Sequence, residues 1–226
     1  VLAIKEGRTI FKNIRKFVTY QLSCNFAELS ILLIGVILSP VLGWQVPILL
    51  ALQILFMNLI TDNLPSITLS FNPSSRDVMD EKPRKNNSIL NKKLIGLIIF
   101  TGALKMIFTL FSYYFSYNIL EHSTEYARTV ALFSLICLEI VSAFNFRSFR
   151  KSVFGRSLFV NPFLFYASSI SLITALVIIY SPLNKLFETL PLMLDGIIIA
   201  ISLAIILVMM FDILKVLNRK YNLIKI

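Results

Sequence analysis

Three acidic residues lie deep inside long apolar segments of this sequence. They are Glu28, Asp62 and Glu139, and each is surrounded by polar neighbours within an otherwise apolar run. A charged side chain at the centre of a bilayer costs about 2.5–3.5 kcal/mol even on the mildest scale, so residues of this kind usually have a function. With a helical rise of about 1.5 Å per residue, all three lie about 12–17 Å from the basic ends of their segments. We therefore expect three carboxylates at one level of a membrane.

The polar neighbours of these acids recur at helical spacing. Asn25 precedes Glu28 by three residues, and Asn58 precedes Asp62 by four, with Thr61 between them. Residues three or four positions apart share one face of a helix. Each acid should therefore present amide or hydroxyl oxygens beside its carboxylate.

Pro65 is expected to add backbone oxygens to this set. Proline has no N–H to donate to the carbonyl of Thr61, and it disfavours helical conformation in the residue that precedes it. Broken backbone at membrane depth is tolerated where it lines a cavity or is buried in protein. An all-oxygen set suits a hard cation such as Ca²⁺. Soft metals prefer thiolates, but Cys24 and Cys137 are isolated in the sequence. The predicted cation ligands are Asn25, Glu28, Asn58, Thr61, Asp62 and Glu139.

A second interpretation applies to single polar residues within spans. Asparagine, threonine or glutamate often forms a hydrogen bond between helices, worth about 0.6–2 kcal/mol. Asn25 taken alone fits that role, whereas the whole set favours a cation site. Lys105 lies within another apolar run. It could snorkel, pair with an acid or donate to a carbonyl, and if it reached the acids it would weaken divalent binding.

The composition requires a membrane protein. Of 226 residues, 57% are hydrophobic and 15% are charged, against about 25% charged in soluble domains, and the mean hydropathy is +0.79. Six apolar runs approach or exceed the roughly 20 residues that span a bilayer as helix, and none shows the strict alternation of barrel strands. We predict an all-α membrane protein with a six-helix transmembrane bundle. The predicted spans are 17–38, 44–69, 94–116, 127–146, 160–180 and 192–214.

The basic residues predict the orientation of these spans. Alternate connections and the two ends of the chain hold 19 Lys and Arg residues, whereas the other three connections hold one, Lys185. Basic loops stay on the cytoplasmic side, so both termini should be cytoplasmic. This topology accounts for the net charge of +10, and no nucleic-acid partner is expected.

Four regions follow from this topology. Residues 1–16 form a cytoplasmic stalk helix that continues into the first span, and residues 17–69 hold the first two spans with the cation ligands. Residues 70–93 form a cytoplasmic loop, and residues 94–226 provide four further spans and a cytoplasmic tail. The chain begins at Val1 on a charged stretch patterned as helix, so we expect it to be an excerpt of a longer polypeptide.

Several stretches resemble the carboxy-terminal membrane half of P-type cation-transporting ATPases. They are K-E-G-R-T-I-F-K-N-I-R-K-F, S-C-N-F-A-E, M-N-L-I-T-D-N-L-P-S-I-T-L-S-F-N-P and D-V-M-D-E-K-P-R. The sequence is most similar to sarco/endoplasmic-reticulum-type calcium pumps. Sodium and proton-potassium pumps have an acid where Asn58 stands, and secretory-pathway calcium pumps lack acids matching Glu28 and Glu139.

The resemblance implies an ATP-driven pump that exports Ca²⁺ from the cytoplasm. All six predicted ligands fall on calcium ligands of the family, with Asp62 expected to bridge two ions. The phosphorylation, nucleotide-binding and actuator domains and the earlier spans would be partners, and Mg²⁺ and ATP would act through them. No Asp-Lys-Thr-Gly-Thr motif occurs in this sequence. We therefore expect no catalytic residue here and no ATP hydrolysis by this chain alone.

We hypothesise that phosphorylation elsewhere in the full protein tilts residues 1–16 and disrupts the ion site. Once emptied, the clustered carboxylates should take up protons, because like charges and burial disfavour ionisation, and H⁺ counter-transport would follow. Two alternatives stay open. One is a pump for Mn²⁺ or a monovalent ion, and the other is a free-standing six-span channel or accessory subunit.

Overall fold

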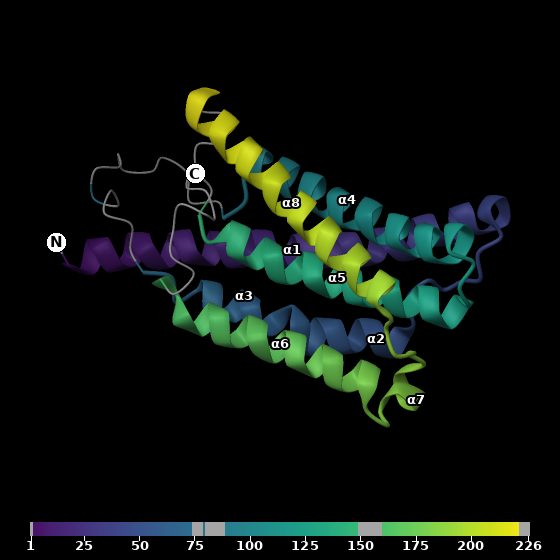
Figure 1. Ribbon diagram of the computed structural model, residues 1–226. Helices are drawn as coiled ribbons and strands as arrows, with labels where there is room; N and C mark the ends of the chain where they lie inside the picture. Colours follow the sequence, from purple (N-terminus) through teal and green to yellow (C-terminus); the bar gives the residue numbers. More distant parts are fainter. Residues whose placement is uncertain (1, 74–78, 80–88, 149–159, 222–226) are drawn as a thin grey trace.

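The computed structural model describes residues 2–73, 79, 89–148 and 160–221, and every regular element in that part of the chain is helical (Figure 1). The long helices α1, α4, α5, α6 and α8 form a bundle together with the shorter segments α2 and α3. The bounds are α1 Leu2–Leu42, α2 Ala51–Phe56, η1 Met57–Thr61, α3 Asn63–Leu69, α4 Lys92–Tyr114, η3 Phe115–Ile119, α5 Thr124–Phe146, α6 Pro162–Tyr180, α7 Asn184–Phe187 and α8 Leu194–Tyr221.

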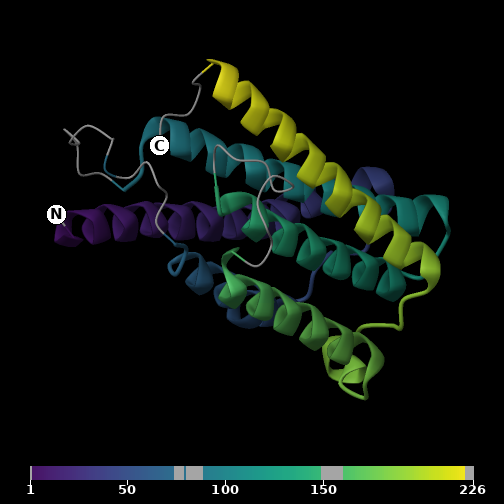
Figure 2. The same cartoon turned by 60° about the vertical axis from the view of Figure 1, so that its left-hand side comes forward.

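Helix α1 is continuous over 41 residues and extends beyond the rest of the bundle at its N-terminal end (Figures 1 and 2). No proline interrupts it before Pro40, which leaves the backbone hydrogen bonds intact along the predicted stalk and first span. Asn13 joins the N-terminal part of α1 to the segment that follows α3, because its side-chain amide donates to the backbone oxygen of Asn72 at 2.7 Å. Helix α1 therefore runs without a break from residue 2 through the whole of the predicted first span.

The second predicted span is a broken helix that begins at Ala51 instead of Trp44. A π-helical turn, η1, separates α2 from α3, and the N–H of Asp62 donates to the carbonyl of Met57, five residues earlier, at 2.9 Å. Pro65 lies in the first turn of α3, where its missing N–H is tolerated. The wider turn and the proline together place the helix break at Asp62. The expected interruption near Pro65 is confirmed.

Within the described residues, five helices are long and apolar enough to cross a membrane. They are Leu2–Leu42, Lys92–Ile119, Thr124–Phe146, Pro162–Tyr180 and Leu194–Leu217. Exposed isoleucine, leucine and valine side chains cover the outer faces, for example Leu33, Val36, Ile198 and Ile205. Apolar surface on this scale is what lipid, not water, accommodates. The protein is an integral, multi-pass membrane protein.

Helix α5 lies at the centre of the bundle. It packs against α4 and α8 on one side and against α6 and the broken helix on the other, and α1 lies along α4 (Figures 1 and 2). Most of α5 is buried, including Glu139 near its middle. The N-terminal end of α1 and the C-terminal end of α8 lie at the same end of the bundle. Most of the predicted loop 70–93, with its D-V-M-D-E-K-P-R stretch, and the last residues of the predicted tail lie outside the described residues.

Asn161 fastens helix α6 to helix α3. Its side-chain oxygen accepts from the N–H of Leu164 at 3.2 Å and so caps α6, and its amide donates to the carbonyl of Thr68 at 2.8 Å and to Asn72 at 3.1 Å. The side chain is 1% exposed. The Asn161 side chain therefore makes these interactions from a buried position.

We expect Asn161→Ala to lower the unfolding free energy by about 2–3 kcal/mol, because one cap and two buried hydrogen bonds are lost. The matched control is Asn91→Ala, since Asn91 caps α4 through Leu94 alone at 2.8 Å and should cost about 1 kcal/mol. Denaturant-dependent unfolding in detergent measures both. Equal effects of the two substitutions would contradict the role of Asn161 in joining α6 to α3.

Candidate cation site

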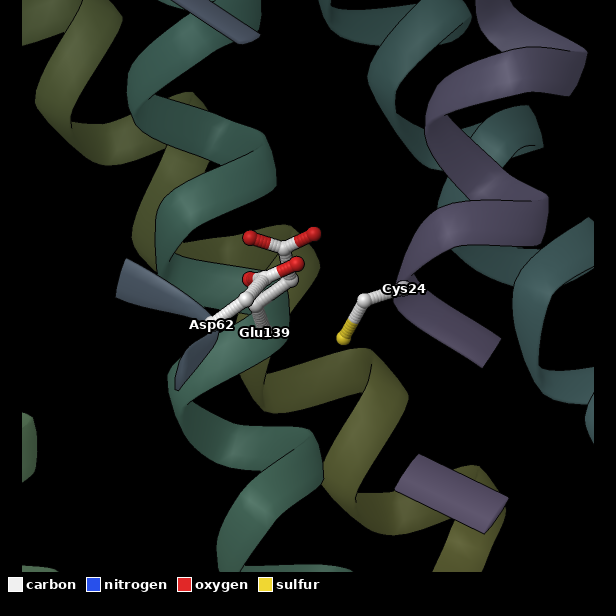
Figure 3. Close-up of side chains that lie close together, drawn as sticks. All are labelled: Cys24, Asp62 and Glu139. Carbon is white, nitrogen blue, oxygen red and sulfur yellow. The ribbon is translucent and has the colours of Figure 1, made fainter. Parts of the chain in front are cut away.

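Asp62 and Glu139 lie side by side in the interior of the bundle (Figure 3). One carboxylate oxygen of each and the Sγ of Cys24 all lie within 4.8 Å of one another, and all three side chains are buried. Asp62 comes from the break in the second helix, Glu139 from α5 and Cys24 from α1. Three separate helices therefore converge on one point.

The carboxylate oxygens at this point have no hydrogen-bond donors among the described residues. Both oxygens of Asp62 and both of Glu139 are buried without a partner, and so is Oε1 of Glu28. Asp62 and Glu139 are 0% exposed. Buried ionised carboxylates left without donors are strongly destabilising, so a cation or protons must compensate them. This is the arrangement that a cation-binding pocket requires.

Glu28 joins the site through the second helix. Its Oε2 accepts a hydrogen bond of 2.8 Å from the amide of Asn58, which also donates to the carbonyl of Ile54 at 3.2 Å. Oε1 of Glu28 and the side-chain oxygen of Asn58 take no part in this hydrogen bond. The predicted proximity of the polar faces of the first and second spans is therefore seen in the structure, because Glu28 lies on α1 and Asn58 on η1.

The other two predicted residues have different surroundings. Thr61 is fully buried, and its hydroxyl donates to the carbonyl of Met57 at 3.0 Å, which leaves the hydroxyl oxygen able to accept. Asn25 is only half-buried, and its Oδ1 lies 3.5 Å from the amide of Gln21 on the same helix. No described contact joins Asn25 to the acids, so its place in the ligand set stays a prediction.

Cys24 belongs to the cluster although the sequence interpretation set it aside as isolated. That interpretation is wrong for Cys24, because its Sγ lies beside the carboxylates of Asp62 and Glu139. The spacing offered a signal, since Cys24 precedes Glu28 by four residues and so shares its helix face. The acids that lie beside Cys24 in space, Asp62 and Glu139, belong to other helices. The position of Cys24 in the sequence therefore does not show that they are close.

Tyr20 holds α1 against α5 at the level of the site. Its hydroxyl lies 3.4 Å from the backbone oxygen of Glu139, and its ring packs edge-on against Phe146 with ring centroids 6.0 Å apart. The side chain is 0% exposed. A buried aromatic with a satisfied hydroxyl fixes the register of two helices, and here it keeps Cys24 facing Glu139.

The sequence of this bundle matches a known family over most of its length. The sequence model described as "Cation transporting ATPase, C-terminus" matches residues 46–217. The chain belongs to the cation-transporting ATPase family, of which it matches the C-terminal membrane region.

Curated relatives of the chain are calcium-transporting ATPases. It is 34% identical over 197 residues to calcium-transporting ATPase 1 of Bacillus cereus, covering 80% of this chain and 22% of the relative. It is 35% identical over 189 residues to calcium-transporting ATPase type 2C member 2 of Rattus norvegicus, covering 83% and 20%. It is 32% identical over 223 residues to the endoplasmic reticulum calcium ATPase srcA of Aspergillus fumigatus, covering 84% and 22%. The chain thus spans about a fifth of the length of these relatives.

Proposed function

We propose that this chain is the carboxy-terminal membrane part of an ATP-driven pump that exports Ca²⁺ from the cytoplasm. The observation that carries the proposal is the pair of buried carboxylates, Asp62 and Glu139, whose four oxygens have no donors in the described structure. Calcium prefers oxygen ligands and accepts carboxylates in irregular geometry. The similarity to calcium-transporting ATPases supports Ca²⁺ as the ion.

The ligand set we propose comprises Asn25, Glu28, Asn58, Thr61, Asp62 and Glu139. Glu28, Asp62 and Glu139 contribute three negative charges. The remaining residues contribute amide or hydroxyl oxygens, and the break before Pro65 leaves the carbonyl of Thr61 without its usual helical donor.

The proposed transport step uses α1 as a rigid lever. Phosphorylation of domains outside this chain would tilt the stalk at residues 1–16, and a continuous helix transmits such motion to Glu28 with little bending. The tilt would separate Glu28 from Asn58, whose 2.8 Å hydrogen bond joins α1 to η1. Emptied carboxylates would then take up protons, which gives H⁺ counter-transport. Both termini would be cytoplasmic, and the broken helix would complete six spans.

The remaining machinery would come from outside this chain. Phosphorylation, nucleotide-binding and actuator domains and earlier spans would supply ATP hydrolysis with Mg²⁺, and this chain alone would be inactive. Membership of the family favours a pump over a free-standing channel or accessory subunit. A pump for Mn²⁺ is the second candidate, because the Sγ of Cys24 beside the carboxylates is a softer ligand than oxygen.

The cation dependence of phosphoenzyme formation tests the proposal. In membranes containing the full-length protein, Ca²⁺ should support phosphorylation by ATP at lower concentration than Mn²⁺, and Na⁺ or K⁺ should not support it. Cys24→Ser should leave the Ca²⁺ requirement in place and raise the Mn²⁺ concentration needed. Phosphorylation that proceeds equally well without any of these cations would contradict the assignment.

A further inference from the structure

Cys24 gives the acid cluster a sulfur atom, which the proposed set of oxygen ligands does not include. Its Sγ and one carboxylate oxygen each of Asp62 and Glu139 lie within 4.8 Å of one another, and Figure 3 shows the sulfur on the side of α1 that faces the two carboxylates. All three side chains are 0% exposed. Sulfur is a poor ligand for a hard cation such as Ca²⁺ and a good ligand for a thiophilic cation such as Zn²⁺. The cluster therefore has donors for a second class of cation.

The surroundings of Cys24 differ from those of a cysteine that only fills space in a core. Cys24 and Cys137 both border apolar side chains, as buried cysteines commonly do. Cys24 also lies beside Asp62 and Glu139, whose four carboxylate oxygens are buried without a hydrogen-bond partner in the described structure, whereas Cys137 belongs to no such cluster among the described residues. Buried carboxylates in this state need a cation or protons. One cation can bind the sulfur and both carboxylates together.

Lys105, on α4, donates a hydrogen bond to this sulfur. Its Nζ lies 3.0 Å from Sγ of Cys24 and 3.3 Å from Oγ of Ser23, and its side chain is 0% exposed. The sequence left open whether Lys105 pairs with an acid, and the oxygens of Asp62 and Glu139 have no hydrogen-bond partner in the described structure. A lysine beside a cysteine favours the thiolate, which is the form that binds metals. Lys105 therefore supports the metal-binding form of the sulfur and leaves the carboxylate oxygens available.

A close contact between α4 and α1 fixes the backbone that carries Cys24. At Gly102, one turn before Lys105, a Cβ atom would lie 2.6 Å from Cδ1 of Phe26 and 2.9 Å from the backbone oxygen of Ser23. Only glycine fits at that distance. The two helices are therefore packed tightly one residue before Cys24. A ligand on a rigid element is already in place when the metal arrives, which favours binding.

The separations of the three ligand atoms suit one bound ion. Zinc binds cysteine sulfur at about 2.3 Å and carboxylate oxygen at about 2.0–2.2 Å, so two atoms bound to the same Zn²⁺ are at most about 4.5 Å apart. The three atoms of the cluster lie within 4.8 Å of one another, and small rotations of the side chains would bring them within that limit. Three protein ligands and an open fourth position are an established arrangement for Zn²⁺.

We propose that Cys24, Asp62 and Glu139 bind a thiophilic divalent cation such as Zn²⁺ in the pocket that takes Ca²⁺. As the bond from the metal to Sγ forms, the S–H bond breaks and the thiol proton is released. The sulfur ligand rests on the geometry of the three side chains, whereas the use of the same pocket by Ca²⁺ rests on the proposed function. Thiophilic cations should therefore compete with Ca²⁺ for this pocket.

Binding of radioactive Zn²⁺ to the full-length protein in membranes tests this inference. Cys24→Ser should weaken the Zn²⁺ affinity by more than about tenfold, because even the loss of a group that only supports a metal ligand costs about 10–100-fold. The same substitution should change the Ca²⁺ affinity by less than about twofold, because Ca²⁺ prefers oxygen ligands. Cys137→Ser is the matched control and should change neither affinity, since Cys137 packs against an apolar cluster on another part of the bundle.

The outcomes separate this inference from the proposed function. An unchanged Zn²⁺ affinity in Cys24→Ser, together with normal Ca²⁺-dependent phosphorylation, would overturn the inference and leave the proposed function intact. Zn²⁺ binding that depends on Cys24, in a protein whose phosphorylation ignores Ca²⁺, would overturn the proposed function and support the sulfur ligand.

X-ray absorption at the zinc edge gives a second readout, which does not depend on activity. Zn²⁺ added in an amount below that of the full-length protein should have a sulfur neighbour at about 2.3 Å in the wild type. In Cys24→Ser, the neighbours of Zn²⁺ should be oxygen or nitrogen alone. A wild-type spectrum without sulfur, or a sulfur signal that persists in Cys24→Ser, would overturn the inference.

Discussion

Asp62→Asn is expected to abolish Ca²⁺-dependent phosphorylation of the full-length pump at a Ca²⁺ concentration that saturates the wild type. Asp62 is fully buried at the helix break, and one of its carboxylate oxygens lies within 4.8 Å of an oxygen of Glu139, close enough for both to bind one ion. With the proposed cation as its partner, loss of the Asp62 carboxylate breaks a buried ion pair, which costs about 3–5 kcal/mol. A loss of that size lowers the affinity by more than about 100-fold. The measurement is phosphoenzyme formation from labelled ATP over a series of free Ca²⁺ concentrations.

The matched control for this substitution is Asp195→Asn. Asp195 lies at the start of α8, where its carboxylate contacts His122 at 2.9 Å and the hydroxyl of Tyr126 at 3.1 Å, away from the acid cluster. Its removal should leave the Ca²⁺ dependence unchanged. A normal Ca²⁺ response of Asp62→Asn, or an equal loss in both variants, would contradict the place of Asp62 in an ion site.

Glu139→Gln is expected to have the second-largest effect on Ca²⁺ affinity. The most informative comparison is with the double variant that combines Asp62→Asn and Glu139→Gln. Alone, the substitution removes one of two adjacent carboxylates and should lower Ca²⁺ affinity by about 100-fold or more. Residues that bind one ion act as a unit, so their effects are non-additive. Asp62→Asn combined with Glu139→Gln should therefore be little worse than Asp62→Asn alone.

The same phosphorylation titration, extended to higher Ca²⁺ concentrations, measures this double-variant cycle. Glu188→Gln serves as a control, because Glu188 lies in the connection after α7, outside the cluster. Fully additive losses in the double variant would show that Asp62 and Glu139 act on separate ions or separate steps, which contradicts a shared pocket.

Much of the fold was predictable because the membrane limits the possible structures. Long apolar runs must be helices in lipid, and all five continuous helices fall on predicted spans. The continuous stalk of α1 follows from the absence of proline before Pro40. The start of the second helix at Ala51 was missed, because the apolar residues 44–50 resemble helix by hydropathy although the described backbone there is not helical.

The candidate site was predictable only where residues share a helix. Spacing placed Asn58, Thr61 and Asp62 together, and the common depth of the acids anticipated the proximity of Asp62 and Glu139. The depth of a residue in the membrane does not show how its helix is rotated about its own axis. The position of Cys24 beside Asp62 and Glu139 could therefore not be predicted from depth. The contact of Lys105 with α1 depends on the close approach at Gly102, which hydropathy does not show.

The location of bound Ca²⁺ tests the central claim most directly. A structure of the Ca²⁺-loaded full-length protein, determined by electron cryomicroscopy, should show the ion between Asp62 and Glu139, with carboxylate oxygens at about 2.3–2.6 Å. Density for Ca²⁺ at that position, with Glu28 nearby, is the predicted result. An ion bound elsewhere in the membrane region, with both carboxylates turned away from it, would contradict the account.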